Sequence, residues 1–214
     1  PYQILVWHEI VNDVIEEERI LVTYCPLCLT GIVFDPVVEG ERVEFGTSGK
    51  LWQSNLVMYD RKTETYWSQV RGEAIVGKLT GTKLTVLPSD QMLFGNWKKE
   101  FPDGEVLSRD TGFTRFYGGT PYAGGDYFGV EGFSLGLVSN RDSRLPDDAF
   151  VFGITIGKKA KAYHVDAVKQ KGEVVDMFEG KSFRLVHDRG LDVVRMYERL
   201  PHGTEERINP ISGF

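Results

Sequence analysis

The chain has 214 residues, of which 41% are hydrophobic and 26% are charged, a composition ordinary for a folded protein with a sizeable core. Its formal net charge of −6 argues against a nucleic-acid partner and against an anionic membrane surface, since either would require a basic patch. No apolar run reaches about 18 residues, so we expect no transmembrane segment in this chain.

The first half of the chain predicts short helices and short strands. Ile4–Ile10 predicts a short, mostly buried helix, which Asn12 and Asp13 end. Asp90 is the predicted N-cap of a helix over Gln91–Glu100. Runs rich in β-branched and aromatic residues predict strands at Arg19–Tyr24, Gly31–Asp35, Arg42–Gly46, Asn55–Asp60, Thr65–Val70 and Lys83–Leu87.

The second half begins with irregular segments. Paired glycines and aromatics in Arg115–Gly129 predict a loop, and Asn140–Asp148 predicts a polar loop. A hairpin turn is predicted at Gly157-Lys158, and a short helix near Ala167–Gln170. Further strands are predicted at Phe150–Ile156, Lys159–Val165, Glu173–Met177, Ser182–His187 and Asp192–Glu198. The predicted fold is therefore α+β and β-rich, with mainly antiparallel short strands and a few short helices.

A weak internal similarity predicts two related halves, 1–140 and 150–214. The second half contains a helical segment, then Gly172–Asp176, then Phe183–Val186. Similar segments follow one another in the same order at the N-terminus. Chance similarity is the alternative explanation. In this overlay the first copy lacks a leading hairpin, so we expect the domain to be incomplete at both ends.

Several motifs in a constant order resemble one family. They are Trp7–Asp13, Val22–Cys28, Ser54–Arg61, Trp67–Gln69, Gly72–Ile75 and Val106–Gly112. Together they are similar to the bacterial and archaeal family catalogued as domain of unknown function 3179. The resemblance implies one β-rich domain over 1–214, with no established activity. It also implies an extracytoplasmic location, as a secreted, periplasmic or cell-envelope protein. Family members usually carry Gly where this chain has Leu29.

The main chemical feature is the CxxC motif Cys25-Pro26-Leu27-Cys28. The two-residue gap lets both sulfurs face one side, where they can chelate a metal ion or close a small disulfide. For a copper or zinc site we expect His8 as a further ligand, and Met58 as a soft ligand if the metal is copper. Without a metal we expect no cofactor.

Three other interpretations of the cysteines stay open. A redox dithiol is one, although Leu29–Phe34 predicts a turn and strand where a thioredoxin-like site would have a helix. A nucleophilic cysteine with His8 as its base is another. The third is a non-enzymatic interaction module with buried or disulfide-bonded cysteines, which would form a homo-oligomer or bind an assembly partner. No complete catalytic motif surrounds the pair, and no motif identifies a small-molecule substrate.

Other motifs are weaker. His8–Asn12 begins like the helix of zinc proteases, but Asn12 replaces the second histidine. Gly46–Lys50 lacks the spacing of a phosphate-binding loop. The Gly-aromatic loop Phe116–Phe128 suits stacking on a sugar or on a partner, or simply covering the core. Polar residues alternating with apolar ones predict a pocket or a plain sheet surface at Ser54, Asn55, Tyr59, Asp60, Ser68 and Gln69.

Overall fold

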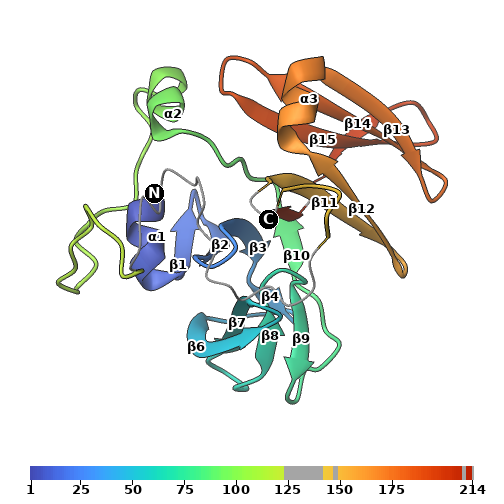
Figure 1. Cartoon of the computed structure of the whole chain (residues 1–214). Coiled ribbons are helices and arrows are strands. Elements are labelled where there is room, and N and C mark those ends of the chain that lie inside the picture. The colour runs from blue at the N-terminus through green and yellow to red at the C-terminus, as the bar shows by residue number, and fades with distance from the viewer. Residues whose placement is uncertain (123–141, 147–148, 209–210, 214) are drawn as a thin grey trace. The chain divides into compact units, whose positions relative to one another are not determined.

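The structure is a computed structural model that describes residues 1–122, 142–146, 149–208 and 211–213 (Figure 1). Within this part of the chain, antiparallel strands dominate and three short helices accompany them, which confirms the predicted β-rich α+β fold. The second part of the Arg115–Gly129 stretch and both ends of the Asn140–Asp148 loop lie outside the described residues.

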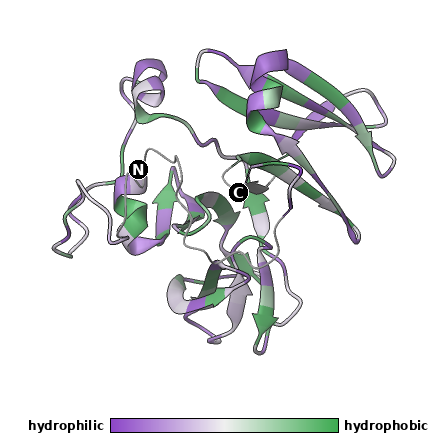
Figure 2. Ribbon diagram, viewed as in Figure 1, coloured by the Kyte–Doolittle hydropathy of each residue, from purple (hydrophilic) through white to green (hydrophobic). Residues whose placement is uncertain are grey.

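The chain divides into two compact units. The first unit comprises the described residues of Pro1–Leu87 and Leu107–Asp148, and the second comprises those of Pro88–Val106 and Ala149–Gly213. The segment Pro88–Val106 therefore belongs with the C-terminal part of the chain. In both units, hydrophobic residues are interspersed with hydrophilic ones along the strands (Figure 2).

The first unit contains one helix and two four-stranded antiparallel sheets, with strand orders β1-β2-β3-β10 and β6-β7-β8-β9. Large side chains that are almost wholly buried form its core, among them Tyr24, Phe34, Phe45 and Trp67. The elements are α1 (Tyr2–His8), β1 (Ile10–Ile15), β2 (Glu18–Cys25), β3 (Thr30–Asp35), β4 (Val37–Val38), β5 (Glu41–Arg42), β6 (Phe45–Trp52), β7 (Asn55–Asp60), β8 (Tyr66–Ser68), β9 (Glu73–Val76) and β10 (Thr85–Leu87).

The second unit has sheets with strand orders β12-β11-β17 and β13-β14-β15-β16. Val168 of its last helix packs into a core that contains Phe183, Leu185 and Met196. The elements are α2 (Phe94–Glu100), β11 (Val151–Ile156), β12 (Lys159–His164), α3 (Val165–Lys171), β13 (Glu173–Phe178), β14 (Lys181–Asp188), β15 (Val193–Arg199), β16 (Glu205–Ile208) and β17 (Ile211–Gly213).

Two local predictions were wrong. Asn12 and Asp13 do not end a helix but lie within β1, and the Asn12 side-chain amide makes both hydrogen bonds to the backbone of Phe45, at 2.8 and 2.9 Å. Asp90 does not cap α2, whose N-cap is Leu93. The Asp90 carboxylate instead accepts hydrogen bonds from the guanidinium groups of Arg195 and Arg207.

The two units share one structural repeat. In each, a seven-residue helix is followed by a six-residue strand, an eight-residue strand and a third antiparallel strand, as α1-β1-β2-β3 and as α3-β13-β14-β15. A fourth strand pairs with the third in both, β10 in one and β16 in the other. The first unit inserts β4–β9 between its third and fourth strands, and the hairpin β11–β12 precedes the second copy.

The backbone angles of the two copies correspond position by position. Positive φ angles occur at Glu9, Glu16, Glu17 and Leu29, and at the matching positions Gly172, Glu179, Gly180 and Asp192. The residue after the helix also makes the same hydrogen bonds in both copies. The Glu9 carbonyl accepts from Tyr24 N–H at 2.7 Å, and the Gly172 carbonyl accepts from His187 N–H at 2.8 Å.

Glu9 is strained where its counterpart is not. Glu9 adopts φ 59° and ψ −33°, and Gly172 adopts φ 79° and ψ −38°. This combination lies outside the regions that residues with a Cβ occupy easily, whereas glycine reaches it at little cost. The first copy therefore carries a side chain at a position where the backbone favours glycine.

Replacing Glu9 by Gly should raise the free energy of unfolding by about 1 kcal/mol, because the strain at positive φ is relieved. Burial raises the pKa of the Glu9 carboxyl above 4.5, so its ionised form opposes folding at neutral pH but not below pH 4.5. The increase in the free energy of unfolding should therefore be larger at neutral pH than below pH 4.5. Urea denaturation of both proteins at the two pH values measures this difference. A loss of stability at both pH values would contradict this account of Glu9.

Candidate functional site

The two cysteines lie at the turn between β2 and β3. Cys25 is the last residue of β2 and is fully buried, while Cys28 lies in the turn and is partly exposed. Both are free thiols. Leu29 follows them with φ 49°, a backbone conformation that favours glycine.

The sulfur of Cys25 accepts hydrogen bonds from the turn itself. The backbone N–H groups of Leu27 and Cys28 both donate to it. In the second copy of the repeat, Asp188 takes the place of Cys25, and its Oδ1 accepts from Gly190 N–H at 3.0 Å and from Leu191 N–H at 3.2 Å. The same turn thus directs its amides at a carboxylate oxygen in one unit and at a sulfur in the other.

Further donors converge on the sulfur of Cys28. The Cys25 thiol donates to it, and so do the side-chain amide of Asn55 at 3.2 Å and the backbone N–H of Thr30, while the Thr30 hydroxyl donates to the Cys28 carbonyl at 3.1 Å. The bond from Cys25 is the largest cause that lowers the pKa of Cys28, and the others add to it against the opposing effect of burial. The same bond, together with burial, raises the pKa of Cys25. Of the two thiols, Cys28 is therefore the one that ionises more readily.

A buried amide network orients Asn55 toward the sulfur. Its Nδ2 also donates to Gln69 Oε1 at 2.8 Å, and its Oδ1 accepts from Val70 N–H at 2.9 Å. Gln69 is fully buried and donates in turn to Thr23 Oγ1 and to the Thr30 carbonyl, both at 3.1 Å. These bonds leave the Asn55 amide only one orientation, with N–H directed at Cys28.

The sequence motifs pointed to Asn55 and Gln69 but not to Thr23 and Thr30. The signal for the threonines lies in the repeat, because Val186 and Val193 occupy the matching positions of the second copy. The scaffold folds there without these hydroxyl groups. The polar network is therefore a feature of the cysteine-bearing unit and not a requirement of the fold.

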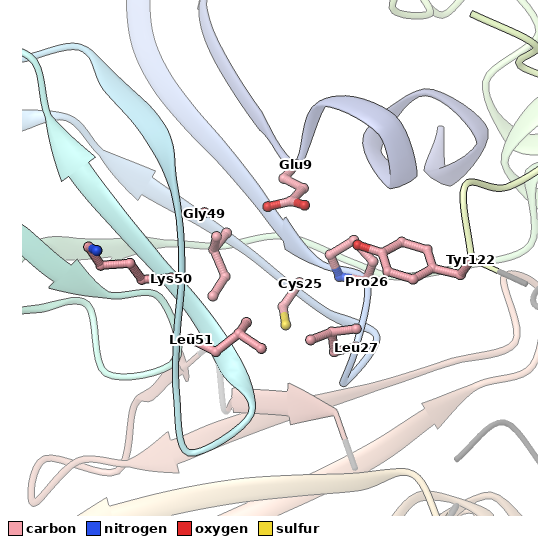
Figure 3. A pocket seen from close by; sticks show the side chains of 9 residues that line it. Glu9, Cys25, Pro26, Leu27, Gly49, Lys50, Leu51 and Tyr122 are labelled. Carbon is pink, nitrogen blue, oxygen red and sulfur yellow. The ribbon is translucent and has the colours of Figure 1, made fainter. Parts of the chain in front are cut away.

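A cavity of about 210 Å³ lies beside Cys25. Figure 3 shows the Glu9 carboxylate on its α1 side and the Cys25 sulfur beside Leu27 and Leu51. Burial, followed by the charges of Glu9 and Cys25, raises the pKa of Tyr122 to about 12. The residues that line the cavity are Glu9, Cys25, Pro26, Leu27, Gly49, Lys50, Leu51, Leu56 and Tyr122.

The two predicted metal ligands besides the cysteines have other partners. His8 Nε2 lies 2.6 Å from the hydroxyl of Tyr117, and its ring also contacts Phe113. Met58 is fully buried on β7, paired with Trp67 of β8. Among the described residues, no three His, Cys, Asp or Glu side chains come together in a way that could hold a metal ion. Copper or zinc binding by Cys25, Cys28, His8 and Met58 stays a prediction.

The remaining predicted pocket residues lie away from the cavity wall. The Ser54 carbonyl oxygen is 4.0 Å from Cys25 Sγ. Asp60 is fully buried and accepts from Trp67 Nε1 at 3.0 Å. Tyr59 packs its ring over Gly46 within the sheet, and Ser68 is buried on β8. Asp60 and Tyr59 thus stabilise the β6–β9 sheet, while Asn55 and Gln69 form the hydrogen-bond network at Cys28.

The described part of the chain contains no helix with both the length and the apolar character needed to cross a membrane.

Replacing Asn55 by Ala should raise the pKa of Cys28 by about one unit, because one hydrogen bond to the thiolate is lost. The rate of alkylation by iodoacetamide against pH reports this pKa, because Cys25 is buried. In the unchanged protein the midpoint should lie well below the ordinary thiol value of 9.0. Asn96→Ala removes an amide from the second unit and serves as the matched control. Equal midpoints in all three proteins would contradict the role given to Asn55.

Neither a search of curated proteins nor one of solved structures found a match for the chain. One family, described as "Protein of unknown function (DUF3179)", matches residues 1–209. This confirms the resemblance of the sequence motifs, and the match covers nearly the whole chain. The chain therefore belongs to the DUF3179 family.

Proposed function

We propose that Cys25 and Cys28 form a redox-active dithiol that exchanges with a disulfide of another molecule, with Cys28 as the attacking sulfur. The observation that carries this proposal is the convergence of donors from Cys25, Thr30 and Asn55 on the sulfur of Cys28. Thiol–disulfide exchange proceeds through the thiolate, and these donors favour the thiolate of the more exposed sulfur.

The exchange takes two steps. The Cys28 thiolate attacks one sulfur of the substrate disulfide, the substrate S–S bond breaks, and the departing sulfur takes up a proton. Cys25 then loses its proton and attacks Cys28, which breaks the mixed disulfide and releases the second substrate sulfur as a thiol. Two electrons pass to the substrate, and the protein retains a Cys25–Cys28 disulfide. The reverse sequence oxidises a substrate dithiol.

The hydrogen bonds also affect the direction of exchange. Donors that stabilise the thiolate stabilise the reduced form of the pair, and a stabilised reduced form makes the disulfide a stronger oxidant. An oxidising pair fits the extracytoplasmic location that the family resemblance implies, since disulfides form and persist in oxidising compartments.

Two other functions are less well supported. A copper or zinc site needs ligands beyond two sulfurs, and His8 is hydrogen-bonded to Tyr117 instead. A purely structural module has no need for a polar network at Cys28, since buried cysteines in such a role behave as small apolar residues.

Dipyridyl disulfide, which releases a coloured product at each step, tests the proposal. The unchanged reduced protein should release two equivalents and end with a Cys25–Cys28 disulfide. Cys28→Ser should slow the release by at least roughly tenfold, because Cys25 is buried and its pKa is raised. Cys25→Ser should release one equivalent and stop as a stable mixed disulfide.

The opposite results point to the other functions. Equimolar copper or zinc that copurifies with the protein and is lost in a Cys25→Ser/Cys28→Ser variant would replace the redox proposal by a metal site. Thiols that stay inert toward dipyridyl disulfide in a stable oligomer would favour an interaction module.

A further inference from the structure

Among the described residues, Glu9 is the one carboxyl group that lines the cavity beside Cys25. It directly follows α1, and Figure 3 shows its carboxylate at the cavity that Cys25 also lines, with the Cys25 sulfur on the side of that residue away from the carboxylate. None of the sequence motifs had assigned a role to this side chain.

The structural repeat separates the backbone role of Glu9 from that of its side chain. The backbone of Glu9 donates to the Leu5 carbonyl at 2.7 Å and accepts from Tyr24, and Gly172 makes the matching bonds to Val168 and from His187. Glycine thus does everything that the backbone requires here and avoids the strain. Strained residues of this kind concentrate at functional sites, where the side chain has a task.

The second step of the thiol–disulfide exchange needs a proton acceptor. Cys25 is fully buried, and its proton must leave before its sulfur can attack Cys28. The other titratable groups around the cavity, Lys50 of β6 and Tyr122, do not serve as acceptors. A lysine ammonium group has no free lone pair, and the raised pKa of Tyr122 keeps its hydroxyl protonated.

We propose that Glu9 accepts the proton of Cys25 across the cavity while Cys25 attacks the mixed disulfide, and returns it when the exchange runs backward. A cavity of about 210 Å³ has room for a water molecule that relays the proton. Burial raises the pKa of the Glu9 carboxyl, which brings its proton affinity closer to that of a thiol and makes the transfer less unfavourable. This inference rests on the proposed dithiol function.

Glu9→Gln tests the inference through the two phases of dipyridyl disulfide reduction. The first phase, attack by Cys28, should stay within about twofold of the unchanged protein. The second phase, attack by Cys25, should slow by roughly 100-fold, the lower end of the usual contribution of a general base. In the unchanged protein the rate of the second phase should depend on pH through ionisation of the Glu9 carboxyl. This dependence should be absent in Glu9→Gln.

Two further variants exclude a folding effect. Glu9→Gly should show the same slow second phase although the protein becomes more stable. Glu16→Gln makes the same chemical change at an exposed turn with positive φ and should leave both phases unchanged.

The possible results distinguish the two proposals. If the unchanged protein releases no coloured product from dipyridyl disulfide, the dithiol function is wrong, and the role of Glu9 is wrong with it. If both phases occur in the unchanged protein and Glu9→Gln leaves them equally fast, only the role of Glu9 is overturned. The same holds if Glu9→Gln slows both phases equally, because Glu9 would then act through Cys28 or the fold.

Discussion

The turn after the second strand of each repeat presents two backbone N–H groups to the last residue of that strand. An acceptor at this position satisfies these N–H groups, which the turn leaves without a strand partner. The second unit supplies the carboxylate of Asp188, whose charge Arg195 balances at 2.9 Å. The first unit supplies the sulfur of Cys25. Because the first unit has a cysteine where the second has an aspartate, a sulfur at the acceptor position lies beside a second sulfur three residues later, at Cys28.

The insertion in the first unit brings buried polar side chains to the cysteine turn. The strands β6–β9 lie between the third and fourth strands of the repeat, and Asn55 comes from this insertion, as does Gln69 just after β8. Their amides reach the cysteine turn and place one N–H on Cys28. The second unit lacks this insertion, and valines replace the two threonines of the network. One scaffold thus carries a polar site in one copy and an apolar core in the other.

The two copies also differ in backbone strain at the residue that follows the helix. Glycine at position 172 and glutamate at position 9 occupy one backbone conformation, and only the glutamate is strained there. The second unit places its charged groups differently. Asp90, from the segment before α2, is bound by Arg195 and Arg207, which stabilises the unit. The buried polar residues Thr23, Asn55 and Gln69 of the first unit form the network next to the cysteines.

The sequence by itself determined the family, the β-rich class, most strands and the Cys25–Cys28 pair, because alternating apolar residues and a two-residue spacing are local signals. It also pointed to Asn55 and Gln69, although for a pocket and not for a sulfur. Only the tertiary structure decided that Asn12 continues a strand, that Asp90 binds arginines, and which of the two thiols has the lowered pKa. These outcomes depend on partners far apart in the chain, such as Asn12 with Phe45 and Thr23 with Gln69. The strain at Glu9 was equally hidden, since residue type does not reveal a positive φ until the helix end and the strand after it are both in place.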